Sequence, residues 1–553
     1  MTAVARYVNL EVFLILLLIA GLTAGCGTSG TTEAGIENGD SKPTRAEMIL
    51  KWNLHTDPKT IDPQLNSASD GADIINNLYE GLMRYTGGEL RPAMASRYTI
   101  SEDLLTYTFY LRDARWSDGK PVTALDFEYT WKRALDPTTA SEYAFQLFYI
   151  KGGQEYFEGT GAKDDVAVKA LDDKTLQITL TTPTPYFISL TSFFTYMPVR
   201  SDAVAGGTDG SWAKNPRMAV SNGPFKLAEY VTGSHITLEK NDYYWQADQV
   251  KLDRLQVYMI VDLSTSLTAY ESGDLDIIDN VPVQEIPRLL AEDPTFSILP
   301  MLGTYYYIFN VTRPPTNDVL VRRALTLAID RKALVQTITK AGQLPAGGMV
   351  PPGLKDANGH DFNRTAGNHG LDVERASIEE ARKLLAEAGY PDGKDFPEIV
   401  LLYNTSDIHK AVAEAIQEMW KVNLGIRIQL SNQEWAVFQE TRRQGNFTIA
   451  RGGWIGDYSD PMTFLDMWLS YSGHNDAQWR NKEYDDIIER SKMIIGQERF
   501  ELLYQAEKML IDQQMVVMPI YYYTDAIMVK DYVRGWEKDS LNHWFFGKAR
   551  LGR

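Results

Sequence analysis

The chain has 553 residues, of which 44% are hydrophobic and 23% charged, and this is the composition of a globular protein. Its formal net charge of −18 argues against a nucleic-acid partner, because binding to phosphates requires basic surface. Cys26 is its single cysteine, so the remainder can form no disulfide, catalytic thiol or thiolate metal site. A chain of this length is expected to form two or three domains.

Residues 1–25 have the pattern of a secretory signal peptide. The apolar run Val12 to Leu22 ends in small residues and is too short to span a bilayer, which needs about 20 apolar residues. Cys26 follows directly and resembles the cysteine of a bacterial lipobox, although Thr23 stands where a leucine is usual. We predict lipidation at Cys26; the alternative is an ordinary signal peptide with an incidental cysteine.

The stretch after Cys26 is rich in Gly, Thr and polar residues and lacks apolar periodicity. This composition predicts a flexible, lipidated tether over residues 26–45. The tether is expected to hold an extracytoplasmic body close to the membrane, at the cell surface or in a periplasm.

Helix and strand signals alternate after the tether. Thr123 is a predicted helix start, since apolar residues follow at four-residue spacing from Phe127. Residues 175–180 (TLQITL) alternate polar and apolar, which predicts a strand with one buried face. Residues 304–311 (TYYYIFNV) are strand-like, and the pattern predicts one helix over 318–338.

Residues 377–430 give the most specific topological signal. Ser377 and Glu380 form a capping box before an apolar-periodic helix, which Gly389 closes. Residues 398–430 then read as strand, helix over about 408–422, and strand over 426–430 (IRIQL). This βαβ pattern predicts parallel strands and an α/β fold, in which ligands bind beyond the carboxyl ends of strands. Since no long linker divides the chain, any domains are expected to exchange strands.

Motifs of common enzymes are missing, including G-x-S-x-G, H-E-x-x-H and the phosphate-binding loop. The seven histidines are scattered, and the loop around His360 is better explained as solvated surface than as a cation site. We therefore predict no enzyme activity, no cofactor and no resident metal. The 30 tyrosines and 12 tryptophans are mostly expected in the core, and they also fit a roomy amphipathic cavity.

Residues 451–461 (RGGWIGDYSDP) combine chemistry suited to a peptide ligand. Their glycines permit close approach of another backbone, Trp454 offers an apolar face, and Asp457 can hold a cation. An extended peptide could add to such a strand. An ordinary glycine-rich turn with a capping aspartate is the alternative.

Several blocks resemble the peptide- and nickel-binding receptors of ATP-driven importers, and the last three resemble the oligopeptide-binding branch. The blocks are YTFYLRDARWSDGKPVTALDFEYTWKRALDP (107–137), NGPFKL (222–227), RRALTLAIDR (322–331), ARKLLAEAGY (381–390), LLYNTSDIHK (401–410), NQEW (432–435) and GWIGDY (453–458). The resemblance implies a type II periplasmic-binding-protein-like clamshell with two lobes and three domains. Carried onto this chain, domain I covers 46–78, 204–302 and 525–553, domain II covers 79–203, and domain III covers 303–524.

The resemblance also implies site residues. The aspartate of the GWxxDY motif pairs with the peptide's α-ammonium, which points to Asp457. Trp454 belongs to the same motif, and its neighbours Gly453 and Ile455 are expected to give backbone hydrogen bonds.

Other positions are expected to hold the peptide's C-terminal carboxylate or to line the cavity. The carboxylate positions, used at different peptide lengths, are His409, Arg442 and Arg451. The cavity positions are Tyr143, Trp435 and Asn280. Trp435 could instead be plain core, and Arg442 could be a surface charge beside Arg443.

The chain departs from this branch at Ile308, where similar proteins carry an acidic residue after the triple tyrosine. This replacement is expected to remove a carboxylate from the cavity wall and puts a preference for basic side chains in doubt.

The sequence therefore predicts a lipid-anchored, monomeric receptor that binds short peptides and presents them to an ABC permease. Within the same family, a dipeptide, signalling peptide, nickel chelate or oligosaccharide remains an alternative ligand. A secreted hydrolase is the alternative from another class.

Overall fold

A large mixed β-sheet runs through the structure, a computed structural model that describes residues 47–539 and 541–552. The predicted signal peptide, Cys26 and the whole predicted tether lie outside the described residues. In spatial order, the sheet consists of β15 (Gln429–Gln433), β14 (Val400–Asn404), β16 (Ile449–Ile455), β12 (Phe296–Phe309), β17 (Val517–Val529), β11 (Ile277–Asp279), β1 (Ile49–Asn53), β10 (Arg254–Tyr258), β9 (His235–Lys240) and β8 (Phe225–Val231), with β13 (Leu344–Pro345) beside β17.

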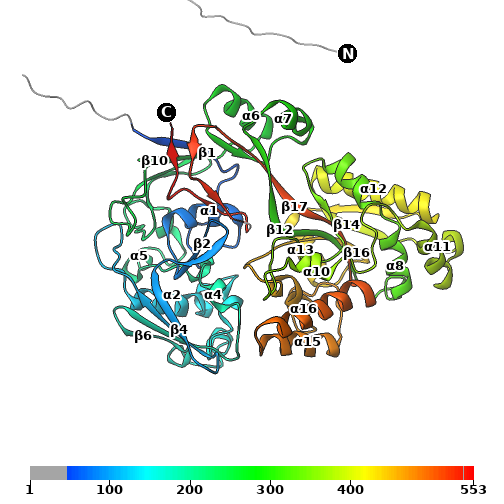
Figure 1. Cartoon of the computed structure of the whole chain (residues 1–553), viewed down its shortest axis with the longest axis horizontal. Helices are drawn as coiled ribbons and strands as arrows, with labels where there is room; N and C mark the ends of the chain where they lie inside the picture. The colour runs from blue at the N-terminus through cyan, green and yellow to red at the C-terminus, as the bar shows by residue number, and fades with distance from the viewer. Residues whose placement is uncertain (1–46, 540, 553) are drawn as a thin grey trace, which may run out of the picture. The chain divides into compact units, whose positions relative to one another are not determined.

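Strands β12 and β17 connect the two ends of this sheet. They pair antiparallel over most of their length and pass between the elements around β1 and those around β14 (Figure 1). Their pairing register shifts between Pro300 and Thr304, and β12 is buried throughout only from Leu302 onward. The expected domain limits at 302/303 and 524/525 fall inside these two strands, and the three-domain division itself stays a prediction.

A smaller antiparallel sheet forms separately. Its order is β4 (Ala95–Ile100), β5 (Thr106–Leu111), β7 (Thr175–Thr179) and β6 (Val168–Asp172). Helix α2 (Ala124–Ala134) packs on β6 and β7 and starts after Thr123, as its sequence predicts. Thr123 and Asp126 form a capping box at this end. The strand predicted at 175–180 is confirmed as β7.

The predicted βαβ unit is confirmed, because β14 and β15 pair in parallel on either side of α12 (Asp407–Leu424). The second strand begins at Gln429, three residues later than expected, since α12 extends to Leu424 and Gly425 ends it with φ +72°. The other main helices are α1 (Ser69–Leu78), α6 (Leu263–Ser272), α7 (Ile286–Glu292), α8 (Val319–Leu327), α11 (Ile378–Glu387), α13 (Trp435–Arg443), α15 (Lys482–Lys492) and α16 (Gln497–Lys508).

Two helix predictions need correction. The single helix expected over 318–338 is broken after α8, because the Asp330 side chain accepts a hydrogen bond from the backbone N–H of Ala333 and starts a new turn. The capping box expected at Ser377 is not formed: its backbone (ψ 66°) departs from the extended cap geometry, and its N–H donates to Leu327 O. Gly389 does follow the end of α11, with φ +95°.

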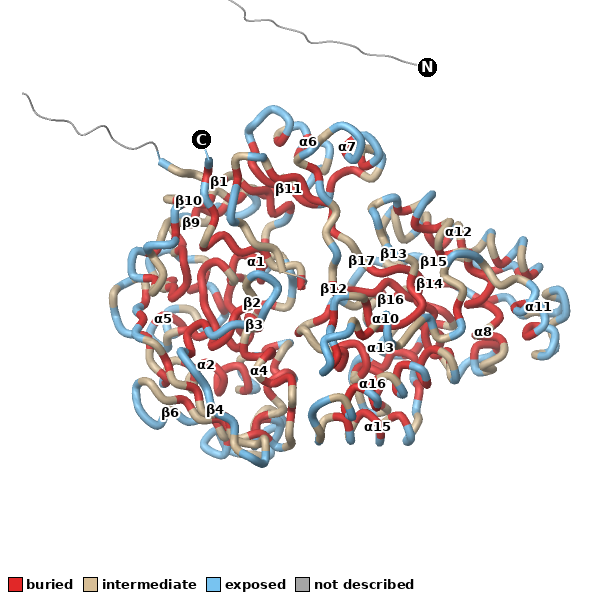
Figure 2. Tube along the Cα trace, in the orientation of Figure 1, coloured by how far each residue is buried: buried red, intermediate tan, exposed pale blue. Residues whose placement is uncertain are grey.

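The hydrophobic core lies along the large sheet and under its helices. Figure 2 shows β11 and β14 mostly buried, whereas the outer sides of α11 and α12 are exposed. Trp420 of α12 is fully buried, and its indole N–H donates to Leu325 O of α8. Among the described residues, no helix is both long and apolar enough to cross a membrane.

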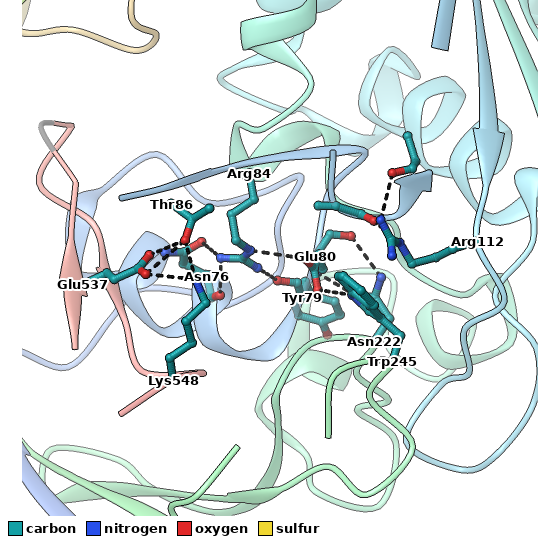
Figure 3. Close-up of polar contacts among 12 residues, drawn as sticks. Asn76, Tyr79, Glu80, Arg84, Thr86, Arg112, Asn222, Trp245, Glu537 and Lys548 are labelled. Carbon is teal, nitrogen blue, oxygen red and sulfur yellow. Dashed lines mark hydrogen bonds and ion pairs between the residues drawn. The ribbon is translucent and has the colours of Figure 1, made fainter. Parts of the chain in front are cut away.

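A buried polar network joins α1 and the chain after it to the segment around residues 222–245 (Figure 3). Arg84 donates to Asn76 Oδ1 at 2.7 Å and to Tyr79 O at 2.8 Å. The Glu80 carboxylate accepts from the Trp245 indole at 3.0 Å and faces Arg84 Nε at 3.5 Å. Because a buried carboxylate is costly unless it is paired, these contacts hold the two segments together.

Candidate functional site

Strand β16 carries four of the expected site residues, and a fifth, Asp457, follows shortly after the strand ends. It pairs with β12 along its whole length but with β14 only at Ile449 and Ala450. From Arg451 onward, no strand in the described part of the chain pairs with that edge. This leaves one side of the Arg451–Ile455 backbone as the place where an extended ligand could add as a strand.

Glycines in β16 make room for tyrosine side chains. A Cβ at Gly452 would lie 2.3 Å from the Tyr306 ring, and one at Gly453 would lie 2.5 Å from the Tyr523 hydroxyl. Larger residues do not fit at these positions because tyrosine side chains already occupy the space. The sequence had suggested instead that the glycines make room for the backbone of another chain.

Arg451 forms the centre of a basic, aromatic cluster. Its guanidinium lies 4.7 Å from the centre of the Tyr305 ring, and Nη2 donates to the Tyr523 hydroxyl at 2.6 Å. Tyr521 stacks on Tyr305 at 4.6 Å between ring centres. Among the described residues, no carboxylate pairs with Arg451, so its charge is free to receive an anion from a ligand.

His409, at the start of α12, joins this cluster through Tyr305. The Tyr305 hydroxyl lies 3.3 Å from His409 Nδ1. Burial and the charge of Arg451 lower the pKa of His409 to about 3, so the imidazole is neutral at neutral pH. His409 can therefore offer a neutral hydrogen bond to a ligand, but not a charge.

Arg442, on α13, is bound differently from Arg451. Its Nε lies 2.9 Å from the Asp476 carboxylate, and its Nη1 donates to the backbone oxygen of Arg451 at 3.2 Å. The reading of Arg442 as a surface charge is wrong. Its position supports the strand edge, and its charge is already compensated.

Asp457 lies just beyond the end of β16. Its Oδ1 accepts a hydrogen bond from the Tyr143 hydroxyl at 3.4 Å, so the structure brings these two expected residues together. The hydroxyl of Thr463 accepts from the backbone N–H of Asp457 at 3.1 Å and from the Trp454 indole at 3.4 Å. These two hydrogen bonds hold in place the loop that follows β16 and the indole ring of Trp454.

The electrostatic surroundings of Asp457 disfavour its charged form. Burial and the nearby charge of Asp466 raise its pKa to about 7, against the lowering effect of hydrogen bonds from Gln146 and Tyr143 and of the charge of His543. No cation forms a salt bridge with Asp457 among the residues described. A ligand cation would therefore favour the ionised carboxylate.

Aromatic side chains from residues 143–193 surround this end of the strand. Tyr186 stacks on Tyr458 at 4.9 Å with an interplanar angle of 8°, and Phe145 meets His474 edge-on at 5.5 Å. Tyr143 itself packs on Phe193 at 5.1 Å. The carboxylate of Asp457 thus lies between two parts of the chain that are far apart in sequence.

The comparisons with known proteins identify the family. Residues 89–476 match the family of bacterial extracellular solute-binding proteins, family 5 Middle. The oligopeptide-binding protein OppA of Bacillus subtilis is 40% identical over 530 residues, covering 94% of this chain and 95% of that protein. The chain belongs to this family.

Solved structures of family members have the same fold. Haemophilus influenzae OppA in complex with the peptide RPPGFSPFR has a TM-score of 0.77 and 30% identity, covering 92% of this chain and 99% of that one. An oligopeptide ABC transporter protein of Borrelia burgdorferi (OppAIV) has a TM-score of 0.78 and 32% identity, covering 91% and 100%. The type II periplasmic-binding-protein fold predicted from the sequence is confirmed.

Two expected site residues are not brought to this family's candidate site by any contact in the structure. Trp435 is 48% exposed on α13 and, among the described residues, stacks only on Phe438, so the reading of it as plain core is wrong. Asn280 is exposed after β11, where its side chain donates to Asp279 Oδ1 at 3.3 Å. Their roles as cavity residues stay predictions.

The expected role of Ile308 needs correction. Side chains alternate along β12, so Ile308 lies on the same face as Tyr306, opposite to Tyr305 and Tyr307. It is 1% exposed, with Ala450 and Val517 as its strand neighbours. An acidic residue at this position would not face the Arg451 cluster.

Sequence reasoning missed Tyr523, Thr463 and Gln146. Tyr523 could have been found, because it ends a run of three tyrosines in a strand and shares the face of Tyr521. Thr463 and Gln146 carry no local signal, since only the folded chain places them beside Asp457. A cavity of about 340 Å³ beside Trp245 and Lys548 is lined by none of the predicted site residues.

Proposed function

We propose that this protein is an extracytoplasmic receptor of an ABC importer, which binds short peptides between its two lobes and presents them to a permease. The observation that carries the proposal is a pair of uncompensated charges, one on β16 and the other just beyond its end. Arg451 has no carboxylate partner in the described chain, and Asp457 has no salt-bridged cation. A peptide zwitterion supplies both missing partners.

The spacing of the two charges supports a peptide rather than a single amino acid. Arg451 and Asp457 are six residues apart, which corresponds to about 20 Å of extended chain. An extended peptide of a few residues covers this span once the reach of the side chains is subtracted. Its backbone can bond to the unpaired edge at Gly453 and Ile455, and such bonds do not depend on peptide sequence.

Ligand identification tests the proposal directly. Native mass spectrometry of the purified protein is expected to release short peptides of mixed sequence. Calorimetry with tri- to pentapeptides is expected to show tight binding that weakens when either terminus is blocked by acetylation or amidation. Co-purification of a sugar or a metal chelate, with no affinity for peptides, would contradict the proposal.

Closure of the two lobes over the ligand is part of the proposal. Peptide binding is expected to reduce the radius of gyration measured by X-ray scattering. It is also expected to raise the free energy of unfolding by about 2.7 kcal/mol at a ligand concentration one hundred times Kd. Unchanged scattering with a peptide proven to bind would count against closure.

We further propose that Cys26 carries the lipid that anchors a monomeric receptor to the membrane. The support is the order of apolar run, small residues and cysteine in the sequence. Cys26→Ser is expected to move the protein from the membrane fraction to the soluble fraction. Wild-type membrane retention of that variant would contradict the anchor while leaving the peptide site untouched.

A further inference from the structure

The cavity beside Trp245 and Lys548 lies outside the candidate peptide site. Its volume of about 340 Å³ is that of pockets which hold small organic ligands. Its walls come from residues 80–93, 244–249 and 537–548, and none of them belongs to the segment that carries Arg451 and Asp457. The parts of the chain before β12 and after β17 therefore build this cavity without the other lobe.

The charges in the cavity wall favour a ligand with one negative charge. Two carboxylates and three cations line the cavity: Glu80, Glu537, Arg84, Arg91 and Lys548. This local excess of one positive charge runs against the formal net charge of −18 of the whole chain. An anion that enters the cavity with a single charge would balance the excess.

The carboxylates in the wall already have hydrogen-bond donors. Glu80 Oε2 accepts from the Trp245 indole at 3.0 Å, and Glu537 Oε2 accepts from the Thr86 hydroxyl at 2.7 Å. Glu537 Oε1 also accepts from Lys548 Nζ at 3.1 Å. In Figure 3, Arg84 lies between these two groups of contacts. A ligand cation would therefore find both carboxylates engaged.

The cations, in contrast, keep unused donors. Lys548 uses two of its three N–H groups, on Thr86 and Glu537. Arg84 is 7% exposed, and its Nε faces Glu80 Oε1 at 3.5 Å but has no hydrogen-bond partner among the described residues. Since buried donors are nearly always satisfied in folded proteins, an acceptor from a ligand fits this wall better than a donor.

Aromatic side chains form another part of the wall. Tyr244, Trp245 and Phe545 all line the cavity. The Arg112 guanidinium lies 3.5 Å from the centre of the Trp245 ring and covers one of its faces, but Arg112 does not itself line the cavity. The Arg84 guanidinium lies 4.2 Å from the centre of the Phe545 ring, so a cation and an aromatic surface meet at one place. This combination suits a ligand that joins a ring to an anionic group.

We propose that this cavity is an accessory site for small aromatic carboxylates. The ligand's carboxylate lies among the three cations, and its ring packs on Trp245 and Phe545. The site differs from the peptide site in its position and in requiring no amine on the ligand. It does not depend on the proposed peptide-binding function.

Titrations followed by NMR of the ligand test the chemical class with three probes. Phenylacetate is expected to bind the wild-type protein with a Kd of about 1 mM or lower. Phenylacetamide keeps the ring but is neutral, and it is expected to bind about tenfold more weakly, the effect of a hydrogen bond to a charged group. Acetate lacks the ring and is also expected to bind about tenfold more weakly. Absence of phenylacetate binding, or equal binding of the amide, would overturn the proposal.

Substitutions in the wall locate the bound probe. Lys548→Met is expected to weaken phenylacetate binding by about tenfold, whereas Lys548→Arg keeps the cation and most of the affinity. Arg217→Met replaces an exposed arginine that does not line the cavity and is expected to bind phenylacetate as wild type does. Equal losses in Lys548→Met and Arg217→Met would show a general effect of charge and would overturn the site.

A second variant keeps the test independent of folding. Lys548→Met also removes the partner of Glu537, so its melting temperature is measured beside its affinity. The Arg91 side chain is 62% exposed, and its ion pair with Glu89 at 2.8 Å contributes little to the fold. Arg91→Met is therefore expected to melt as wild type does and to bind phenylacetate about threefold more weakly. Wild-type affinity in both variants would overturn the site.

A variant of the peptide site separates the two places where a carboxylate could bind. Arg451→Met is expected to bind phenylacetate as wild type does, because Arg451 does not line the cavity. If Arg451→Met loses phenylacetate while Lys548→Met keeps it, the probe binds beside Arg451. In that case the accessory site is wrong, and the proposed peptide-binding function stands.

Discussion

The basic end of the candidate site, at Arg451 within β16, and its acidic end, at Asp457 just beyond the strand, use charge in different ways. Arg451 keeps a permanent charge among tyrosines, and its neighbour His409 is neutral because its pKa is lowered to about 3. Asp457 sits where burial and Asp466 raise its pKa to about 7, so its charge depends on pH. Arg451 is therefore always charged and able to bind an anion, whereas Asp457 becomes fully charged only when a cation binds or the pH rises.

The largest effect is expected at the acidic end. Asp457→Ala removes the partner of a buried ammonium, and breaking a buried ion pair costs about 3–5 kcal/mol. At about 1.4 kcal/mol for each tenfold change, peptide affinity is expected to fall at least about a hundredfold in calorimetry. Asp457→Asn is expected to be milder because it keeps a hydrogen-bond acceptor. Equal affinity of Asp457→Ala and wild type would remove the acidic end from the site.

At the basic end, Arg451→Met is expected to weaken binding by about ten- to a hundredfold, the value of charge-assisted hydrogen bonds to the ligand's carboxylate. The loss should nearly vanish for peptides with an amidated C-terminus, since both changes remove one interaction. A loss that is the same for amidated and free peptides would show that Arg451 supports the site without contacting the carboxylate.

The pH dependence is expected to come from the acidic end alone. Asp457 is more protonated in the free protein than in the complex, so affinity should fall up to about tenfold for each pH unit below about 7. Above about pH 8 it should fall again, as the peptide's own amine loses its proton. The acidic limb should disappear in Asp457→Asn and persist in His409→Gln. Its persistence in Asp457→Asn would assign it to Asp466 or His543, the other titratable groups that affect Asp457.

The smallest effect on affinity is expected at Arg442. Its charge is compensated by Asp476 at 2.9 Å, so it has little attraction left for a ligand. Arg442→Met leaves Asp476 buried without a cation and is expected to lower the melting temperature while changing affinity less than about threefold. A large loss of affinity with unchanged stability would show that Arg442, like Arg451, contacts the ligand.

Local patterns predicted the parts of the fold that depend on neighbours in sequence. The helix start at Thr123 and the βαβ unit around α12 formed as expected, because helix caps and the alternation of side chains along a strand act over a few residues. The break at Asp330 was missed, since the capping of Ala333 by Asp330 competes with continuation of the helix. The side of the sheet that Ile308 faces follows from alternation along β12, and alternation could have placed it correctly.

The sequence predicted the site residues that belong to a recognisable motif. It could not predict roles that depend on tertiary contacts. The sequence pointed to Asp457, Arg451 and His409, and the structure places the last two together around Tyr305. The sequence could not distinguish Arg442 from Arg451, because only the position of Asp476 in the fold decides which arginine has its charge compensated. Gln146 was equally hidden, since only the folded chain brings its amide beside Asp457.

The central claim is that Asp457 receives the ligand's ammonium, and a two-by-two calorimetric experiment tests it most directly. Wild-type protein and Asp457→Ala are each titrated with one tripeptide carrying either a free or an acetylated N-terminus. Acetylation is expected to weaken binding to wild type by about a hundredfold and to matter much less to the variant, because both changes remove the same ion pair. Additive losses would contradict the claim and place the ammonium elsewhere.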